Sequence, residues 1–102
     1  MFVAKVSGSV VSTQKVDSMT GQKLLIVEPF RLEPKDRQSL VSTGRTFIAV
    51  DALGAGVGDM VLITQGSSAR FTPETGKLPI DCVIIGIVDT VSIEKSNIYS
   101  RQ

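Results

Sequence analysis

The sequence predicts a mainly all-β fold, in which five strands form an OB-like barrel with one short helical segment. Its apolar residues come in runs of roughly four to eight, mostly rich in Val and Ile, as is typical of strands. Turn-forming Gly, Pro, Ser and Asp residues separate these runs. No stretch keeps apolar residues at helical spacing over three turns, so we do not expect a long amphipathic helix.

The five expected strands end where turn-forming residues begin. They lie near residues 2–12, 22–32, 45–52, 59–65 and 81–93. Pro29, in the second strand, has no N–H for a sheet ladder, so it belongs at an edge or a bulge. Pro34 and the charged stretch Glu33–Arg37 end the second strand and open a surface loop. Three glycines connect the third strand to the fourth: Gly54, Gly56 and Gly58.

Residues 66–80 hold the only helical turns that we expect. Ser67 is a good N-cap for a turn over 66–70. Pro73 suits the first position of a second short turn, which Gly76 ends.

The length of 102 residues fits one domain. We expect this barrel domain to span residues 1–94. The polar residues 95–102 form a C-terminal tail, either an arm or a frayed end.

The composition excludes several classes of protein. A net charge of +1 argues against a dedicated nucleic-acid binder. The absence of histidine removes Ser-His and Cys-His nucleophiles and imidazole metal sites, so we expect no catalytic residues, cofactor or metal. Cys82, the single cysteine, fits a buried structural thiol in a reducing compartment.

The chain lacks the sequence patterns of membrane and secreted proteins. The N-terminal residues do not form a signal peptide. The longest apolar run, Cys82–Val88, is far shorter than the roughly 20 residues of a membrane helix. We therefore expect a soluble cytosolic protein.

Some predicted strands are apolar on both faces, whereas a strand with one wet face alternates apolar and polar residues. In the last strand, Val83, Ile85 and Ile87 are expected on one face and Cys82, Ile84 and Val88 on the other. Leu24–Val27 and Met60–Ile63 behave alike. We expect another copy of the chain to cover the second face. The alternative is that loops and the short helical segment fold over it.

Two small-residue motifs do not fit the enzymes that they suggest. Gly54–Gly58 lacks the Rossmann spacing and leads into a strand instead of a helix. Gly66–Arg70 lacks the closing glycine and the histidine base of a nucleophile elbow. Both motifs allow close approach of another backbone. The candidate residues of a subunit interface or an axial opening are Gly54, Gly56, Gly58, Asp59, Gly66, Ser67, Ser68, Ala69 and Arg70.

The order and spacing of several motifs over residues 1–89 resemble the EutN/CcmL family of pentameric vertex proteins. The matching segments are Val3–Gly8, Val10–Lys15, Gly21–Leu25, Ala49–Asp51, Gly54–Leu62, Gly66–Arg70, Pro79–Asp81 and Ile84–Asp89. The resemblance implies a five-stranded barrel that assembles into a homopentamer. It also implies a non-enzymatic role, closing the corners of a bacterial microcompartment shell in the cytoplasm beside hexameric shell proteins.

Two other functions remain open at this point. One is an OB-like binding module for an oligonucleotide or a small ligand, against which the near-neutral charge and the scarcity of aromatic residues argue. The other is a small enzyme that uses paired carboxylates. It has candidates in Asp51, Asp59, Asp81 and Asp89, although turn capping is the ordinary role of such residues at strand ends.

Overall fold

The computed structural model describes residues 1–12, 16–19, 21–66 and 81–101, and the statements below concern these residues. In chain order the elements are β1 (Phe2–Val10), the 3-10 turn η1 (Asp17–Met19), β2 (Lys23–Leu32), β3 (Leu40–Ser42), β4 (Phe47–Asp51), β5 (Met60–Gln65), β6 (Cys82–Ile87), β7 (Thr90–Ile93) and β8 (Ser96–Ser100).

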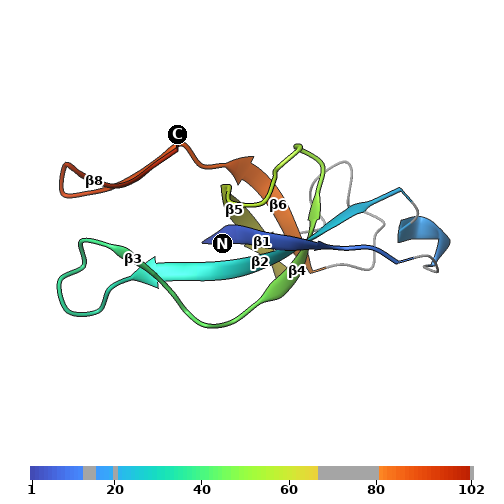
Figure 1. Ribbon diagram of the computed structural model, residues 1–102, viewed down its shortest axis with the longest axis horizontal. Helices are drawn as coiled ribbons and strands as arrows, with labels where there is room; N and C mark the ends of the chain where they lie inside the picture. The colour runs from blue at the N-terminus through green and yellow to red at the C-terminus, as the bar shows by residue number, and fades with distance from the viewer. Residues whose placement is uncertain (13–15, 20, 67–80, 102) are drawn as a thin grey trace.

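Five strands close into a barrel (Figure 1). The order around it is β1, β5, β6, β4 and β2, and β2 pairs again with β1. The β4–β6 pair is parallel, whereas the other pairs of the barrel are antiparallel. β3 extends the sheet from the far end of β2, and β7 and β8 form a separate hairpin. The predicted all-β class and five-stranded barrel are confirmed.

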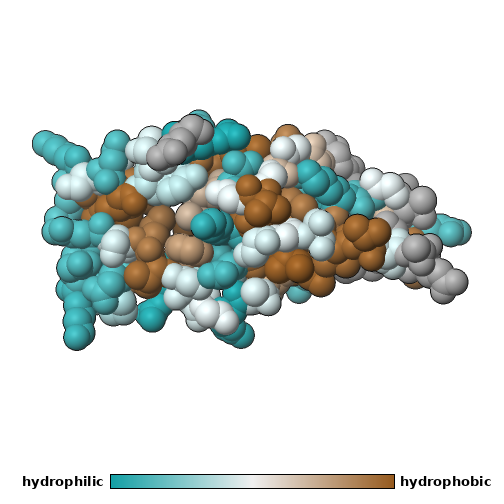
Figure 2. Space-filling model, in the orientation of Figure 1, coloured by the Kyte–Doolittle hydropathy of each residue, from teal (hydrophilic) through white to brown (hydrophobic). Residues whose placement is uncertain are grey.

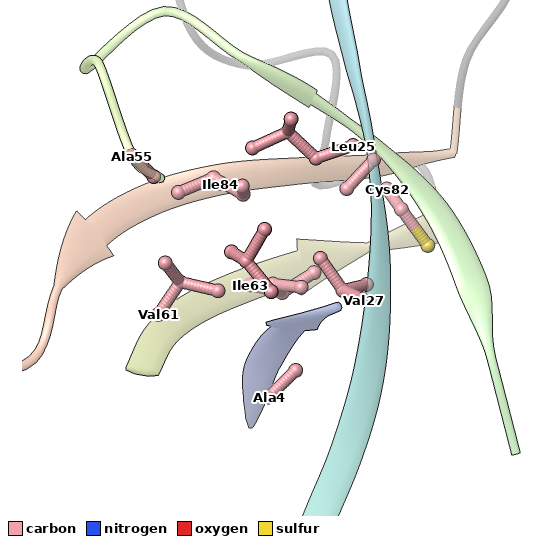
Figure 3. Packing of buried hydrophobic residues seen from close by; sticks show 10 residues of the cluster. Ala4, Leu25, Val27, Ala55, Val61, Ile63, Cys82 and Ile84 are labelled. Carbon is pink, nitrogen blue, oxygen red and sulfur yellow. The ribbon is translucent and has the colours of Figure 1, made fainter. Parts of the chain in front are cut away.

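The barrel is filled by small and β-branched side chains (Figure 3). Val6, Val27 and Ile63 are fully buried and come from three different strands. Burying one such side chain contributes about 1.5–3 kcal/mol. Ala4 and Ala49 leave room for these larger side chains in the same cluster. The alternation of inward and outward residues along β2 matches the sequence pattern.

Pro29 lies where β2 changes its partner. On one side of β2 it pairs with Ala4 of β1. On the other side, the pairing with β4 ends at Val27 and the pairing with β3 begins at Phe30. A residue without an N–H is tolerated at this break in the ladder.

The predicted strand over 81–93 is wrong in two respects. It is divided into β6 and β7, because the chain leaves the barrel after Val88, whose N–H donates to the carbonyl of Met60 at 2.8 Å. It also contains a bulge, since the register with β5 skips Ile85. The bulge reverses the alternation, so that Ile87 packs against the core cluster instead of sharing the face of Ile85, which is 37% exposed.

The region predicted as a polar tail contains β8, which folds back on β7. Its turn consists of Glu94 and Lys95, both with positive φ (49° and 70°), as a two-residue hairpin turn of this hand requires. The predicted domain boundary after residue 94 falls inside this turn and remains a prediction. The predicted helical turns over 66–70 and 72–76 lie, apart from Gly66, outside the described residues.

Within the described ranges, the structure has no helix that is long and apolar enough to cross a membrane.

Candidate functional site

The predicted glycines lie in residues 52–59, hereafter the glycine loop, which joins β4 to β5 at one edge of the barrel (Figure 1). Asp51, at the end of β4, holds the first half of this loop. Its carboxylate accepts hydrogen bonds from the N–H groups of Leu53 (2.9 Å) and Ala55 (2.8 Å). The Asp51 side chain is fully buried, so these bonds replace the water that it loses on folding.

Lys23 completes this arrangement. Its Nζ lies 3.5 Å from Oδ2 of Asp51 and donates a 2.7 Å hydrogen bond to the carbonyl of Ala55. Ala55 is itself fully buried and lies beside Ile84 in the core (Figure 3). The first half of the glycine loop is therefore fixed both by polar contacts and by packing.

Asp59 holds the second half of the loop. Its Oδ2 accepts the N–H of Gly56 at 2.9 Å. Two backbone hydrogen bonds of 2.9 Å connect this half to β1, because Gly58 donates to the carbonyl of Val6 and Val6 donates to the carbonyl of Asp59. The glycine loop is thus a rigid part of the barrel wall.

The three glycines of the loop differ in whether their backbone conformation requires a glycine. Gly54 and Gly58 have φ of +87° and +93°, in the region that favours glycine. Gly56 lies outside that region, and a Cβ there would meet only Oδ2 of Asp59, at 4.0 Å. The chain's own conformation therefore does not require a glycine at position 56.

The exposed side of the glycine loop is apolar and lies beside the end of β8. Leu53 is 50% exposed and Val57 73% exposed. The guanidinium of Arg101 lies 3.6 Å from Asp59 and 3.9 Å from Asp89, and so connects the loop to the base of the β7–β8 hairpin. A pocket of about 380 Å³ between loop and hairpin is lined by Val57, Gly58, Asp59, Tyr99, Ser100 and Arg101.

A second exposed apolar surface lies on the outside of β2 and β4. Ile26 and Ile48 are direct partners across these strands, and Ile48 is 55% exposed. A depression of about 480 Å³, hereafter the apolar groove, is lined by Ile26, Thr46, Phe47, Ile48 and Asp81. Figure 2 shows hydrophobic residues open to solvent on the face of the barrel toward the viewer. The chain therefore leaves part of the second face of its strands uncovered.

The structure separates the two predicted motifs. Gly54, Gly56, Gly58 and Asp59 lie together in the glycine loop before β5. Gly66 follows the other end of β5, where its N–H donates to the carbonyl of Asp81 at 2.8 Å. Ser67, Ser68, Ala69 and Arg70 lie outside the described residues.

Sequence reasoning missed the roles of three residues that shape this region. The sequence indicates Asp51 only as one of several strand-end carboxylates. No sequence pattern indicates the contacts of Lys23 and Arg101, because their partners are distant in the chain.

The titratable groups of the site do not form a reactive cluster. Cys82 is 2% exposed, and burial, followed by the negative charge of Asp81, raises the pKa of its thiol. Cys82 therefore stays protonated and unreactive at neutral pH. In the part of the chain that the structure describes, no group of three or more carboxylate or thiol side chains is placed to hold a metal ion.

Comparison with known proteins identifies clear relatives. The profile of the family described as "Ethanolamine utilisation protein EutN/carboxysome" matches residues 1–89. The bacterial microcompartment shell vertex protein PduN of Salmonella typhimurium is 45% identical over 92 residues, which cover 90% of this chain and 99% of PduN.

Solved structures agree with this relationship. The structure of Gloeobacter violaceus CcmL superposes with a TM-score of 0.86 at 38% identity and covers 99% of this chain and 98% of that one. GrpN, a pentameric microcompartment shell protein from Rhodospirillum rubrum, superposes with a TM-score of 0.74 at 41% identity, over 91% of this chain and 98% of its own.

Proposed function

The chain belongs to the EutN/CcmL family of structural shell proteins, and from this premise we propose that five copies form a ring that closes a vertex of a bacterial microcompartment shell. One observation of the structure carries the proposal. The closed barrel leaves an apolar surface around Ile26 and Ile48 open to solvent. Such a surface marks a contact with another protein, and a neighbouring copy in the ring covers it.

The function is geometric. A flat sheet of six-fold units does not close, whereas a five-fold unit removes one sector and creates curvature. In a ring, a surface on one copy meets a different surface on the next, and the ring closes when the rotation between copies allows it. The hexameric shell proteins that form the flat facets are the expected partners at the outer edge of the ring.

We assign the predicted small-residue motifs to contacts between copies or to the axial opening of the ring. Gly56 supports this assignment, since its own chain does not require a glycine there. A glycine without a conformational role is expected where another backbone approaches closely. Gly54, Gly58 and Asp59 share its loop, and the assignment extends to residues 66–70 as well.

Native mass spectrometry tests the ring directly. We expect a species of five times the 10.9 kDa chain mass, stable at micromolar concentration. Gly56→Trp is expected to keep its circular dichroism spectrum, because the site has room for a side chain, and to lose the five-fold species. A wild-type chain that sediments as a single subunit at high concentration refutes the proposal. Normal rings of Gly56→Trp refute only the placement of the loop.

Co-expression with hexameric shell proteins tests the role at the vertex. Electron microscopy is expected to show closed polyhedral shells when this chain is present and open or tubular assemblies when it is absent. If shells close equally well with and without this chain, the vertex function is refuted and the role of the ring is unexplained.

A further inference from the structure

The β7–β8 hairpin and the barrel form separate hydrogen-bonded sheets, and the side chain of Arg101 connects them. We propose that the hairpin is a strap, which opens as one unit while the barrel stays folded. The ion pairs of Arg101 with Asp59 and Asp89 hold this strap closed against the glycine loop. The inference concerns the single subunit and does not depend on the ring.

The hairpin has little stability of its own. It is a two-stranded sheet, which is marginally stable in water. No residue of β7 or β8 is fully buried. Within the described ranges, no hairpin residue belongs to the core cluster of the barrel or packs against it as a partly buried residue. Glu94 and Lys95 also have positive φ, which is unfavourable for residues other than glycine. We therefore expect the hairpin to open at a lower free energy than the barrel.

The turn of the hairpin is not fastened to the barrel. In Figure 1 the hairpin extends away from the barrel, and its turn is the part farthest from its base. The turn and the loop between β2 and β3 line a depression of about 190 Å³, formed by Asp36, Arg37, Gln38, Ile93, Glu94 and Ser96. Among the residues that the structure describes, no hydrogen bond or ion pair joins residues 90–100 to the barrel or to this loop.

The hairpin is fastened at its base. Just before it, the N–H of Val88 donates to the carbonyl of Met60 at 2.8 Å. Just after it, the N–H of Arg101 donates to the carbonyl of Asp89 at 2.7 Å. The guanidinium of Arg101 lies 3.6 Å from Asp59 and 3.9 Å from Asp89. Because Asp59 belongs to the rigid glycine loop, the Arg101 side chain joins the hairpin to a fixed point of the barrel wall.

The ion pairs of Arg101 are weak enough for the strap to open. The side chains of Arg101, Asp59 and Asp89 are 43%, 22% and 82% exposed. Ion pairs between partly exposed charges contribute little, and salt screens them. We expect the loss of both pairs to raise the population of the open hairpin about 2- to 10-fold.

Opening of the strap changes the surface beside the glycine loop. The pocket of about 380 Å³ at this place has one wall from the loop and one from the end of the hairpin. A hairpin that moves away from the loop withdraws Tyr99 and Ser100 from this pocket. The strap therefore controls how much of the exposed side of the glycine loop is open to solvent.

Hydrogen exchange of the full chain tests the strap. Amides of β7 and β8 are expected to exchange about 100-fold faster, or more, than those of β2 and β5 after correction for intrinsic rates. Arg101→Gln keeps the backbone N–H of residue 101. It is expected to accelerate exchange in the hairpin about 2- to 10-fold and to leave the barrel amides unchanged. Arg101→Lys is expected to restore part of the protection, and about 1 M salt to remove the difference between Arg101→Gln and the wild type.

Arg31→Gln is the matched control. It makes the same substitution at an exposed arginine of β2, which forms no ion pair with the residues that the structure describes. We expect its hairpin to exchange as in the wild type. Hairpin and barrel amides that exchange at one common free energy overturn the strap. An unchanged hairpin in Arg101→Gln at low salt, or an equal acceleration in Arg31→Gln, overturns the role of Arg101.

Discussion

Asp51→Ala is expected to destabilise the subunit by about 3–4 kcal/mol. The carboxylate accepts two backbone hydrogen bonds, of 2.9 and 2.8 Å, and its side chain is fully buried. Hydrogen bonds to a charged group contribute about 1.5–3 kcal/mol each. The ion pair with Lys23 adds about 1 kcal/mol or less, because the lysine side chain is 49% exposed. Since these contributions share one carboxylate, the total is smaller than their sum.

Urea unfolding measures this loss. Wild type and variants must be compared at one protomer concentration, because assembly adds a concentration-dependent term to the apparent stability. Asp89→Ala is the matched control, since its carboxylate is 82% exposed and, among the residues that the structure describes, forms one ion pair, at 3.9 Å. We expect the control to change the free energy of unfolding by about 0.5 kcal/mol or less. A loss below about 1 kcal/mol for Asp51→Ala, or one equal to that of the control, refutes the claim that Asp51 fixes the loop.

Three further predictions concern the core, the thiol and the hairpin. Ile63→Ala is expected to cost about 2–5 kcal/mol in urea unfolding, because Ile63 is fully buried in the barrel, and a loss below about 1 kcal/mol would contradict this packing. Because the pKa of Cys82 is raised, the folded state holds the thiol proton more tightly than the unfolded state. This difference contributes a constant amount to the free energy of unfolding at lower pH, and the contribution is lost as the pH rises above about 8.5. Cys82→Ala should therefore flatten the fall in unfolding free energy between about pH 8 and 10, and an unchanged slope would refute the assignment. Lys95→Gly is expected to increase amide protection in the β7–β8 hairpin by about 1 kcal/mol, because Lys95 has φ of 70°, and unchanged hydrogen exchange would contradict this.

The barrel was predictable because its strands carry their own signals. Runs such as Leu24–Val27 are short, β-branched and bounded by turn-forming residues, so their number and order follow from the pattern. β3 and β8 were not predicted, because β3 has three residues and β8 (Ser96–Ser100) is mostly polar. β3 is too short and β8 too polar for a strand to be recognised from the sequence.

The bulge at Ile85 could not be predicted from the sequence, for a different reason. Where a strand is apolar on both faces, a shift of one residue leaves the pattern unchanged, so the sequence does not reveal which residues face inward. Only the register with β5 shows that Ile84 and Ile87 share the core side. The contacts of Lys23 and Arg101 could not be predicted either, because they depend on loops that meet only after the barrel has closed.

Substitutions at two glycines of the loop distinguish effects on folding from effects on assembly. Gly58 has φ of +93°, so Gly58→Ala forces a side chain into a disfavoured conformation and is expected to destabilise the isolated subunit by about 1–2 kcal/mol. Gly56→Ala meets no such strain and no close neighbour within its own chain, so the subunit is expected to keep its unfolding free energy within about 0.5 kcal/mol. If the proposed placement of the glycine loop between copies is right, its effect should appear instead as a weaker ring in native mass spectrometry at low protein concentration. If Gly56→Ala unfolds as easily as Gly58→Ala and its rings dissociate no more readily than those of the wild type, then position 56 serves the fold alone, and another surface must hold the copies together.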